Sequence, residues 1–232
     1  MTDETMVFNG HILHRIRATE DLQPFHDVKK GDLGGWIEKK ENIRSRGWVA
    51  NEAKVYYEAE VRDFATVRDN GIVCDFAVVR DFARVIENAK VVAYAEVRSS
   101  AEVRGSASIS GHAVISGHAE VFGDAKVLDS SVIFDDAKIY DNAEVYDDAK
   151  VYDNAEICGN STIAANAEVS GDAKIKGDAI VYGVVCDYGV VEGNAQVNAF
   201  GKVDGSKIVG GSEIVGKVEK EQAEDESAEM SM

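Results

Sequence analysis

Two histidines are the residues of this sequence best suited to acid-base chemistry. His112 and His118 occur six residues apart in the segment SGHAVISGHAE. An imidazole titrates near neutral pH, so it can act as a general base that removes a proton from a hydroxyl or an amine. We find no carboxylate that the sequence places to orient either ring. Both histidines also occupy a position that Asn, Asp or Ser holds elsewhere, which favours a structural role in a turn with positive φ.

A row of arginines could bind anions. Arg44, Arg62, Arg80 and Arg98 follow one another at a constant interval of three hexapeptides, and no arginine occurs after Arg104. A fold in which three hexapeptides make one coil would stack them on one face, where guanidinium groups could hold phosphates or carboxylates. The alternative is an exposed ladder that neighbouring glutamates neutralise. The candidate ligand-binding residues are Arg44, Arg62, Arg68, Arg80, Arg98 and Arg104.

A strict six-residue repeat must position these side chains. Every sixth residue from Ile37 to Val181 is Val or Ile, 25 positions without an interruption, and a small residue precedes most of them by two. In the unit from Asn142 to Asp147 the pattern alternates as in a short strand with one buried face, and Asp, Asn or Gly then makes a corner. Short strands that alternate with tight corners predict a parallel β-helix.

The repeat resembles the hexapeptide-repeat family, whose fold is a left-handed parallel β-helix with three hexapeptides per coil. The resemblance implies an all-β triangular solenoid of about ten coils over residues 37–216. Residues 1–36 are expected to form a small N-terminal β cap with a hairpin at Asn9-Gly10. The repeat shifts its register within 183–189. Residues 217–232 are polar and acidic, and we predict a disordered acidic tail there.

The second half of the repeat carries a belt of large side chains that point outward. Such a belt favours a protein interface and a homo-oligomer, although aromatic residues also favour strands for cross-strand packing. The aspartates at the neighbouring corners could bind Ca²⁺, but Asp is also a common corner residue, so we predict no metal. The belt consists of Phe122, Leu128, Phe134, Tyr140, Tyr146 and Tyr152.

The composition of the chain limits the classes of partner that the protein is expected to bind and indicates its cellular compartment. The net charge of −17 would repel phosphates, so direct nucleic-acid binding is not expected, whereas a basic partner is allowed. Three cysteines form no metal-binding motif. No signal peptide and no membrane-spanning run is evident, and we expect a cytoplasmic protein.

The segments HRIRA and DVKKGDLGGWIE resemble the N-terminal part of bacterial and phage hexapeptide proteins that are labelled acyltransferases. Enzymes of this family are often trimers that use acyl-CoA and a histidine base. They usually interrupt the coils with a loop, which this repeat lacks, and we find no Ser-His-Asp order or phosphate-binding loop. We therefore predict a non-catalytic, oligomeric binding or scaffolding protein without a cofactor. One form of it is a phage protein that binds or inhibits a host factor. The alternative is a trimeric acyl-CoA-dependent acyltransferase that uses His112 or His118.

Overall fold

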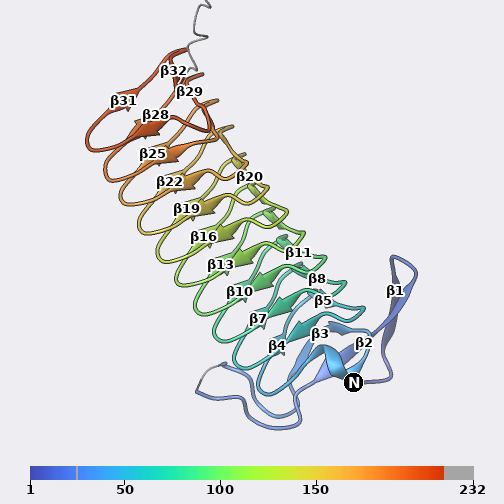
Figure 1. Ribbon diagram of the computed structural model, residues 1–232. Coiled ribbons are helices and arrows are strands. Elements are labelled where there is room, and N and C mark those ends of the chain that lie inside the picture. Colours follow the sequence, from blue (N-terminus) through green and yellow to red (C-terminus); the bar gives the residue numbers. More distant parts are fainter. Residues whose placement is uncertain (25, 217–232) are drawn as a thin grey trace, which may run out of the picture.

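The computed structural model describes residues 1–24 and 26–216. It is a parallel β-solenoid of about ten turns, which confirms the predicted all-β fold (Figure 1). Short strands lie on three faces, and each strand pairs with the strand one coil away. The only helical element of the described residues is a short 3-10 turn, η1 (Lys40–Asn42). The chain starts at one end of the rod, and the last strand lies at the other end.

The three faces are three parallel sheets, which we call faces A, B and C. Face A contains β5 (Lys54–Val55), β8 (Ile72–Val73), β11 (Lys90–Val91), β14 (Ser108–Ile109), β17 (Lys126–Val127), β20 (Glu144–Val145), β23 (Thr162–Ile163), β26 (Ile180–Val181), β29 (Gln196–Val197) and β32 (Ile214–Val215). Face B contains β6 (Glu60–Val61), β9 (Val78–Val79), β12 (Glu96–Val97), β15 (Val114–Ile115), β18 (Val132–Ile133), β21 (Lys150–Val151), β24 (Glu168–Val169), β27 (Val184–Val185) and β30 (Lys202–Val203). Face C contains β4 (Trp48–Val49), β7 (Thr66–Val67), β10 (Arg84–Val85), β13 (Glu102–Val103), β16 (Glu120–Val121), β19 (Lys138–Ile139), β22 (Glu156–Ile157), β25 (Lys174–Ile175), β28 (Val190–Val191) and β31 (Ile208–Val209).

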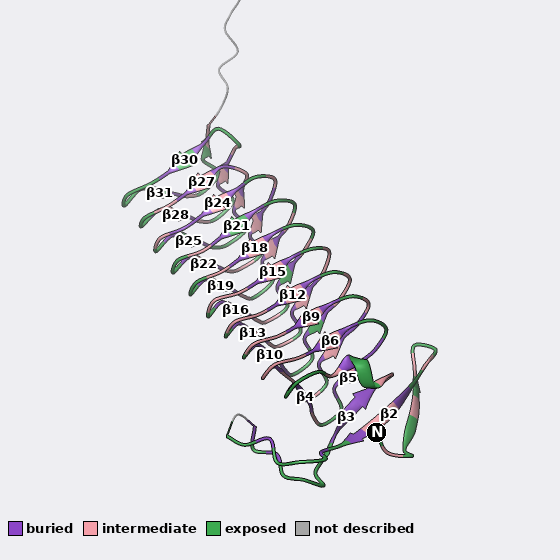
Figure 2. Cartoon of the chain, turned by 60° about the horizontal axis from the view of Figure 1, so that its bottom comes forward, coloured by how far each residue is buried: buried purple, intermediate pink, exposed green. Residues whose placement is uncertain are grey.

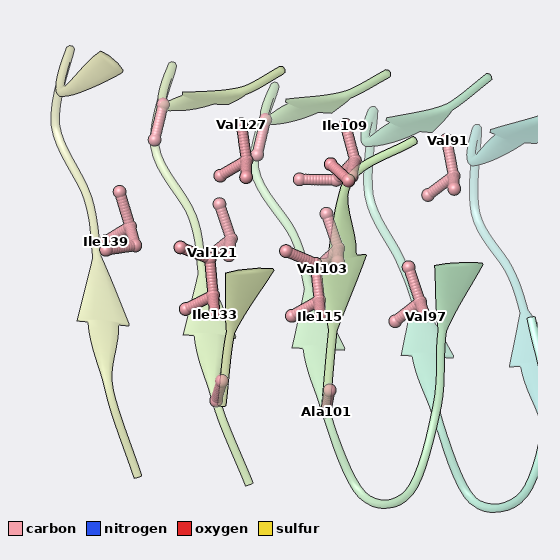
Figure 3. Close-up of a cluster of buried hydrophobic side chains, with 14 of the residues drawn as sticks. Val91, Val97, Ala101, Val103, Ile109, Ile115, Val121, Val127, Ile133 and Ile139 are labelled. Atoms are coloured by element: carbon pink, nitrogen blue, oxygen red, sulfur yellow. The ribbon is translucent and has the colours of Figure 1, made fainter. Parts of the chain in front are cut away.

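The inward Val and Ile residues form three ladders that fill the rod (Figure 3). Val97, Val103 and Ile109 follow one another on faces B, C and A, and all three have no exposed surface. The alanines two residues before them, such as Ala101, are equally buried. Each ladder therefore removes apolar surface from water at roughly 25 cal/mol per Å², and this burial is what the six-residue period encodes. Figure 2 shows buried residues in every coil of the rod, where they alternate with intermediate and exposed ones.

Aspartates at the corners serve the backbone. The second corner residue has positive φ, for example 60° at Asp81 and 59° at Asp147, a conformation that Asp tolerates. The Asp81 carboxylate accepts a hydrogen bond from the backbone N–H of Ser99, one coil further on, at 2.9 Å. Asp147 accepts from Ala165 in the same way, also at 2.9 Å. These contacts explain the aspartates at the positive-φ position as turn chemistry. No group of metal-binding side chains occurs among the described residues.

The N-terminal cap continues face A. Strands β1 (Thr5–Phe8) and β2 (His11–Arg17) form an antiparallel hairpin across Asn9 and Gly10, both of which have positive φ. Strand β3 (Leu33–Ile37) pairs antiparallel with β2 and parallel with β5. The expected boundary between residues 36 and 37 falls inside β3, because one strand completes the cap and also begins the solenoid.

The segment between β2 and β3 is held against the first coils by His26. The side chain is buried, with its Nε2 2.9 Å from the Arg46 carbonyl oxygen and its Nδ1 3.3 Å from the Thr66 hydroxyl. A neutral imidazole satisfies both contacts when Nε2–H donates to the carbonyl and Nδ1 accepts from the hydroxyl. Burial lowers the pKa of His26 below its ordinary value, although the hydrogen bond to Arg46 acts in the opposite direction.

One coil is two residues shorter than the others. Val169 pairs with Val185, sixteen positions later, whereas the regular pairs are eighteen apart. The corner between β26 and β27 has only Tyr182 and Gly183, where other corners have four residues. A Cβ on Gly183 would lie 2.4 Å from the carbonyl oxygens of Asn198 and Gly201, so the tight corner requires glycine. The shift that the sequence indicates is therefore a shortened corner.

The acidic tail expected over residues 217–232 lies outside the described residues. Within the described part of the chain, no helix is both long and apolar enough to cross a membrane.

Candidate binding face

The first set of candidate arginines lies along face B. Arg62, Arg80 and Arg98 directly follow the inward residues Val61, Val79 and Val97, none of which has any exposed surface. The strands β6, β9 and β12 are neighbours in one sheet, so the three arginines share one outward face. Arg44 extends the row, since Ile43 forms a parallel bridge with Val61. The row that the spacing predicts is therefore present.

The arginines of this row differ in their partners. Arg44 forms an ion pair with Glu60 at 2.9 Å, and Arg80 forms one with Glu96 at 2.5 Å. In both pairs the glutamate is sixteen positions after the arginine, which places it diagonally across on the next coil. The hydrogen bond and the charge of Glu96 raise the pKa of Arg80, so this guanidinium is firmly neutralised.

Arg62 and Arg98 have no such partner. The diagonal positions sixteen residues further on are Val78 and Val114, which cannot accept a hydrogen bond. Neither arginine forms an ion pair within the described residues, and the Nε of each is buried without an acceptor there. A buried donor without an acceptor is unfavourable by about 1–3 kcal/mol, because it has lost its hydrogen bond to water. Face B therefore carries two guanidinium groups that the described chain does not neutralise.

Aromatic columns border this face on both sides. On the corner between faces A and B, Phe76, Tyr94 and His112 stack with 4.9 Å between successive ring centroids. On the corner between faces B and C, Phe64 stacks on Phe82 at 5.1 Å. Phe76, Tyr94 and Phe82 remain about half exposed. Arginines between exposed aromatic rings are the composition that protein interfaces favour.

The second set of arginines lies on face C and is neutralised internally. Arg84 and Arg104 both bind Glu102, and Arg104 also reaches Glu120 at 3.2 Å. These side chains line a shallow hollow of about 270 Å³ together with Ser100 and His118. Arg68, on the same face, has only Asp69 nearby at 3.9 Å. Because its charges are paired, this hollow is a weaker anion site than face B.

The structure corrects the interpretation of the two histidines. Positive φ belongs to the preceding glycines, 73° at Gly111 and 68° at Gly117, so neither histidine takes the place of Asn at positive φ. His112 is the last ring of the stack on Tyr94. His118 Nδ1 lies 3.7 Å from the Asp136 carboxylate, and both side chains are largely exposed. Asp136 lies one coil later in the sequence and beside His118 in space, but at this distance it forms no hydrogen bond that would orient the ring.

His118 and Asp136 share a column with Ser100, each one coil from the next. A Ser-His-Asp series therefore lies on three successive coils, with one member on each. Its geometry is not that of a working triad. The 3.7 Å separation of His118 and Asp136 is longer than a hydrogen bond, and Ser100 and His118 form none within the described chain.

The predicted belt is divided among the three faces. Phe122 stacks on Tyr140 at 5.0 Å on face C, and Phe134 stacks on Tyr152 at 4.8 Å on face B. The Arg104 guanidinium lies 4.0 Å from the Phe122 ring centroid. Tyr152 donates to the Glu168 carboxylate. Leu128 and Tyr146 occupy the corresponding positions on face A. All six are partly buried, so each face presents two of these side chains.

Comparison with protein-family models and with curated proteins finds no match for this chain.

Proposed function

We propose that this protein is a non-catalytic binding or scaffolding protein, and that face B between Arg62 and Ser116 is its binding surface for an acidic partner. The observation that carries the proposal is the pair of arginines, Arg62 and Arg98, whose diagonal positions hold valine instead of glutamate. Every arginine that has a glutamate at the diagonal position on the next coil forms an ion pair with that glutamate. Arg62 and Arg98 are available to a carboxylate from another molecule.

The setting of the arginines indicates the chemistry of the partner. Val78 and Val114 lie beside them, and half-exposed aromatic rings border the face. A protein surface that combines carboxylates with apolar side chains complements all of these features. A nucleic-acid backbone would complement the arginines but not the valines and aromatic rings beside them.

The oligomeric part of the proposal rests on the belt residues. Phe134 and Tyr152 continue face B beyond the arginines, so two copies could associate through them without covering Arg62 or Arg98. A trimer is the form that the hexapeptide-repeat resemblance favours. A host protein bound by a phage-encoded protein in the cytoplasm is one partner consistent with this reading.

Affinity capture with matched variants tests the binding function. The double variant Arg62→Gln/Arg98→Gln is compared with Arg68→Gln/Lys90→Gln, which removes the same charge from faces C and A. We expect a protein captured by the wild type to be lost from the first variant and kept by the second. Equal capture by both double variants, with the fold intact by circular dichroism, would remove face B as the binding surface.

An acyl-CoA-dependent acyltransferase is the second candidate, and one contact favours it. The Asp136 carboxylate lies 3.7 Å from His118 Nδ1, which places an acidic group beside the imidazole, although the distance is longer than a hydrogen bond. The exposure of both side chains and the unbroken coils beside them favour the binding function instead.

A further inference from the structure

The aromatic column on the corner between faces A and B ends beside a hollow. Phe76, Tyr94 and His112 stack with angles of 4° and 9° between successive ring planes. The next residue of this column, one coil further on, is Ser130. The corner keeps its register there, because the His112 backbone N–H donates to the Asp129 carbonyl oxygen at 2.6 Å. The stack therefore stops because serine has no ring, and no ring of the column covers the far side of the His112 imidazole.

The hollow begins at Ser130 and has a volume of about 300 Å³. This volume is at the lower end of the range for small-molecule sites in proteins. A planar ring that continued the column beyond His112 would enter the hollow over Ser130. The lining is polar, with three residues from the corner column and two from face B: Ser130, Asp148, Asn166, Lys150 and Glu168.

Two charged groups in the hollow have no partner within the described chain. Asp148 is the third residue of its corner, a position at which Asp172 accepts a hydrogen bond from Asn154 at 3.0 Å. The residue one coil before Asp148 is Ser130, and the Asp148 carboxylate accepts no hydrogen bond from any residue that the structure describes. Lys150 likewise forms no ion pair there. A carboxylate and an ammonium group are therefore both available to a ligand in the hollow.

We propose that this hollow binds a planar heterocycle whose edge carries a carbonyl oxygen next to two N–H donors, the pattern of guanine. The ring stacks on His112 in the place of the next column member, as bases stack on aromatic side chains in other proteins. The Asp148 carboxylate accepts from the two N–H groups, and the Lys150 ammonium donates to the carbonyl oxygen. Adenine presents one amino group beside an unprotonated ring nitrogen, which the carboxylate would repel.

The charges around the hollow favour a neutral ligand. Asp148 and Glu168 each bring a carboxylate, whereas Lys150 brings the one ammonium group of the lining. Glu168 also accepts a hydrogen bond from Tyr152, so it remains ionised beside the site. A phosphate at this place would meet more negative than positive charge. The ligand class is therefore a guanine nucleoside or free base instead of a nucleotide.

An NMR titration of the full-length chain with guanosine tests the site through the ring signals of His112. The blocking variant is Ser130→Phe, which puts a ring of the chain itself where the ligand would stack. The corner tolerates this substitution, because Phe76 and Tyr94 hold equivalent positions in the same column. The matched control is Ser106→Phe, at the equivalent position of the corner between faces C and A. We expect saturable shifts in the wild type and in the control, and an affinity at least about fivefold lower in Ser130→Phe.

Adenosine tests the hydrogen bonds of the proposed site. We expect the wild type to bind guanosine at least about tenfold more tightly than adenosine, because hydrogen bonds to a charged group are strong. Asp148→Asn should remove most of this preference and keep the stacking on His112. Asp172→Asn, the same substitution on the corner between faces B and C, should leave the preference unchanged.

Three results would overturn the proposal: no saturable shift of the His112 signals in the wild type, equal losses in Ser130→Phe and Ser106→Phe, or equal affinities for guanosine and adenosine. Circular dichroism of each variant shows whether the fold is intact. These outcomes are independent of the proposed function, because the hollow lies beyond Ser116, at the end of the surface proposed for the acidic partner.

Discussion

Arg80 donates a hydrogen bond from its Nε to the carboxylate of Glu96, a residue sixteen positions later on the adjacent coil. The same diagonal joins Arg104 to Glu120. This diagonal relationship predicts that the glutamate introduced by Val78→Glu will form an ion pair with Arg62, which has no acidic partner on its diagonal. Because exposed ion pairs are weak, we expect the free energy of unfolding to rise by less than about 1 kcal/mol. Capture of an acidic partner should fall as far as it does in Arg62→Gln. The control is Val78→Gln, which has a similar size but no charge and should retain more of the partner.

The shortened coil predicts a strong effect at Gly183. A methyl group there would lie 2.4 Å from two carbonyl oxygens, so Gly183→Ala must displace backbone that is hydrogen-bonded on both sides. We expect a loss of about 1–3 kcal/mol in urea unfolding, as for other overpacked sites. Gly210→Ala is the matched control, since its nearest neighbour is the Glu192 side chain at 3.5 Å. Equal midpoints for the two variants would contradict this account of the corner.

His26 predicts a pH dependence of the N-terminal cap. Burial lowers the pKa of His26 in the folded protein, so the unfolded chain binds a proton more readily than the folded chain. The stability associated with the neutral ring is therefore complete well above pH ~6.5, the unfolded value, and decreases as the pH falls through and below it. Urea unfolding at pH 7.5 and 5.5 measures this difference. It should be smaller in His26→Gln, and an unchanged difference would assign the pH dependence to other groups.

The belt predicts self-association. If Phe134 and Tyr152 form a subunit contact, the wild type should have the mass of an oligomer, with a trimer expected, in light scattering at micromolar concentration. Phe134→Lys/Tyr152→Lys should reduce the mass to that of a monomer, because two desolvated charges would oppose association. The control Phe76→Lys/Tyr94→Lys changes an exposed stack outside the belt. A monomeric wild type would mean that the stacked rings serve only cross-strand packing.

His118 provides the test of catalysis. We expect no acyltransferase turnover that depends on either His112 or His118, since the first ring belongs to a stack and the second is exposed. Acyl-CoA donors with detection of free thiol are assayed on the wild type, His112→Asn, His118→Asn and Asp136→Asn. General base catalysis typically contributes ~10²–10⁴-fold, so the loss of a true base is easily measured. Turnover that collapses in His118→Asn and weakens in Asp136→Asn would establish the acyltransferase alternative.

Much of the arrangement follows from the period alone. The inward positions of Val61, Val79 and Val97, and the common face of the arginines that follow them, depend only on the count of residues per coil. The same count also identifies two pairs of neighbours in space. Asp136 follows His118 by one full coil, and Glu96 lies on the diagonal from Arg80. These contacts are periodic, so inspection of one coil against the next suffices to find them.

Only the tertiary structure shows which arginines stay unpaired and how the rod begins. Two carboxylates lie within reach of Arg104, which binds both Glu102 and Glu120, and only atomic positions decide such a choice. His26 meets Arg46 and Thr66 across a segment without any repeat. In a periodic sequence, every position has an equivalent one coil away. The contacts of one coil can therefore be predicted from those of the next. The cap has no equivalent positions, so its contacts arise from the three-dimensional path of the chain alone.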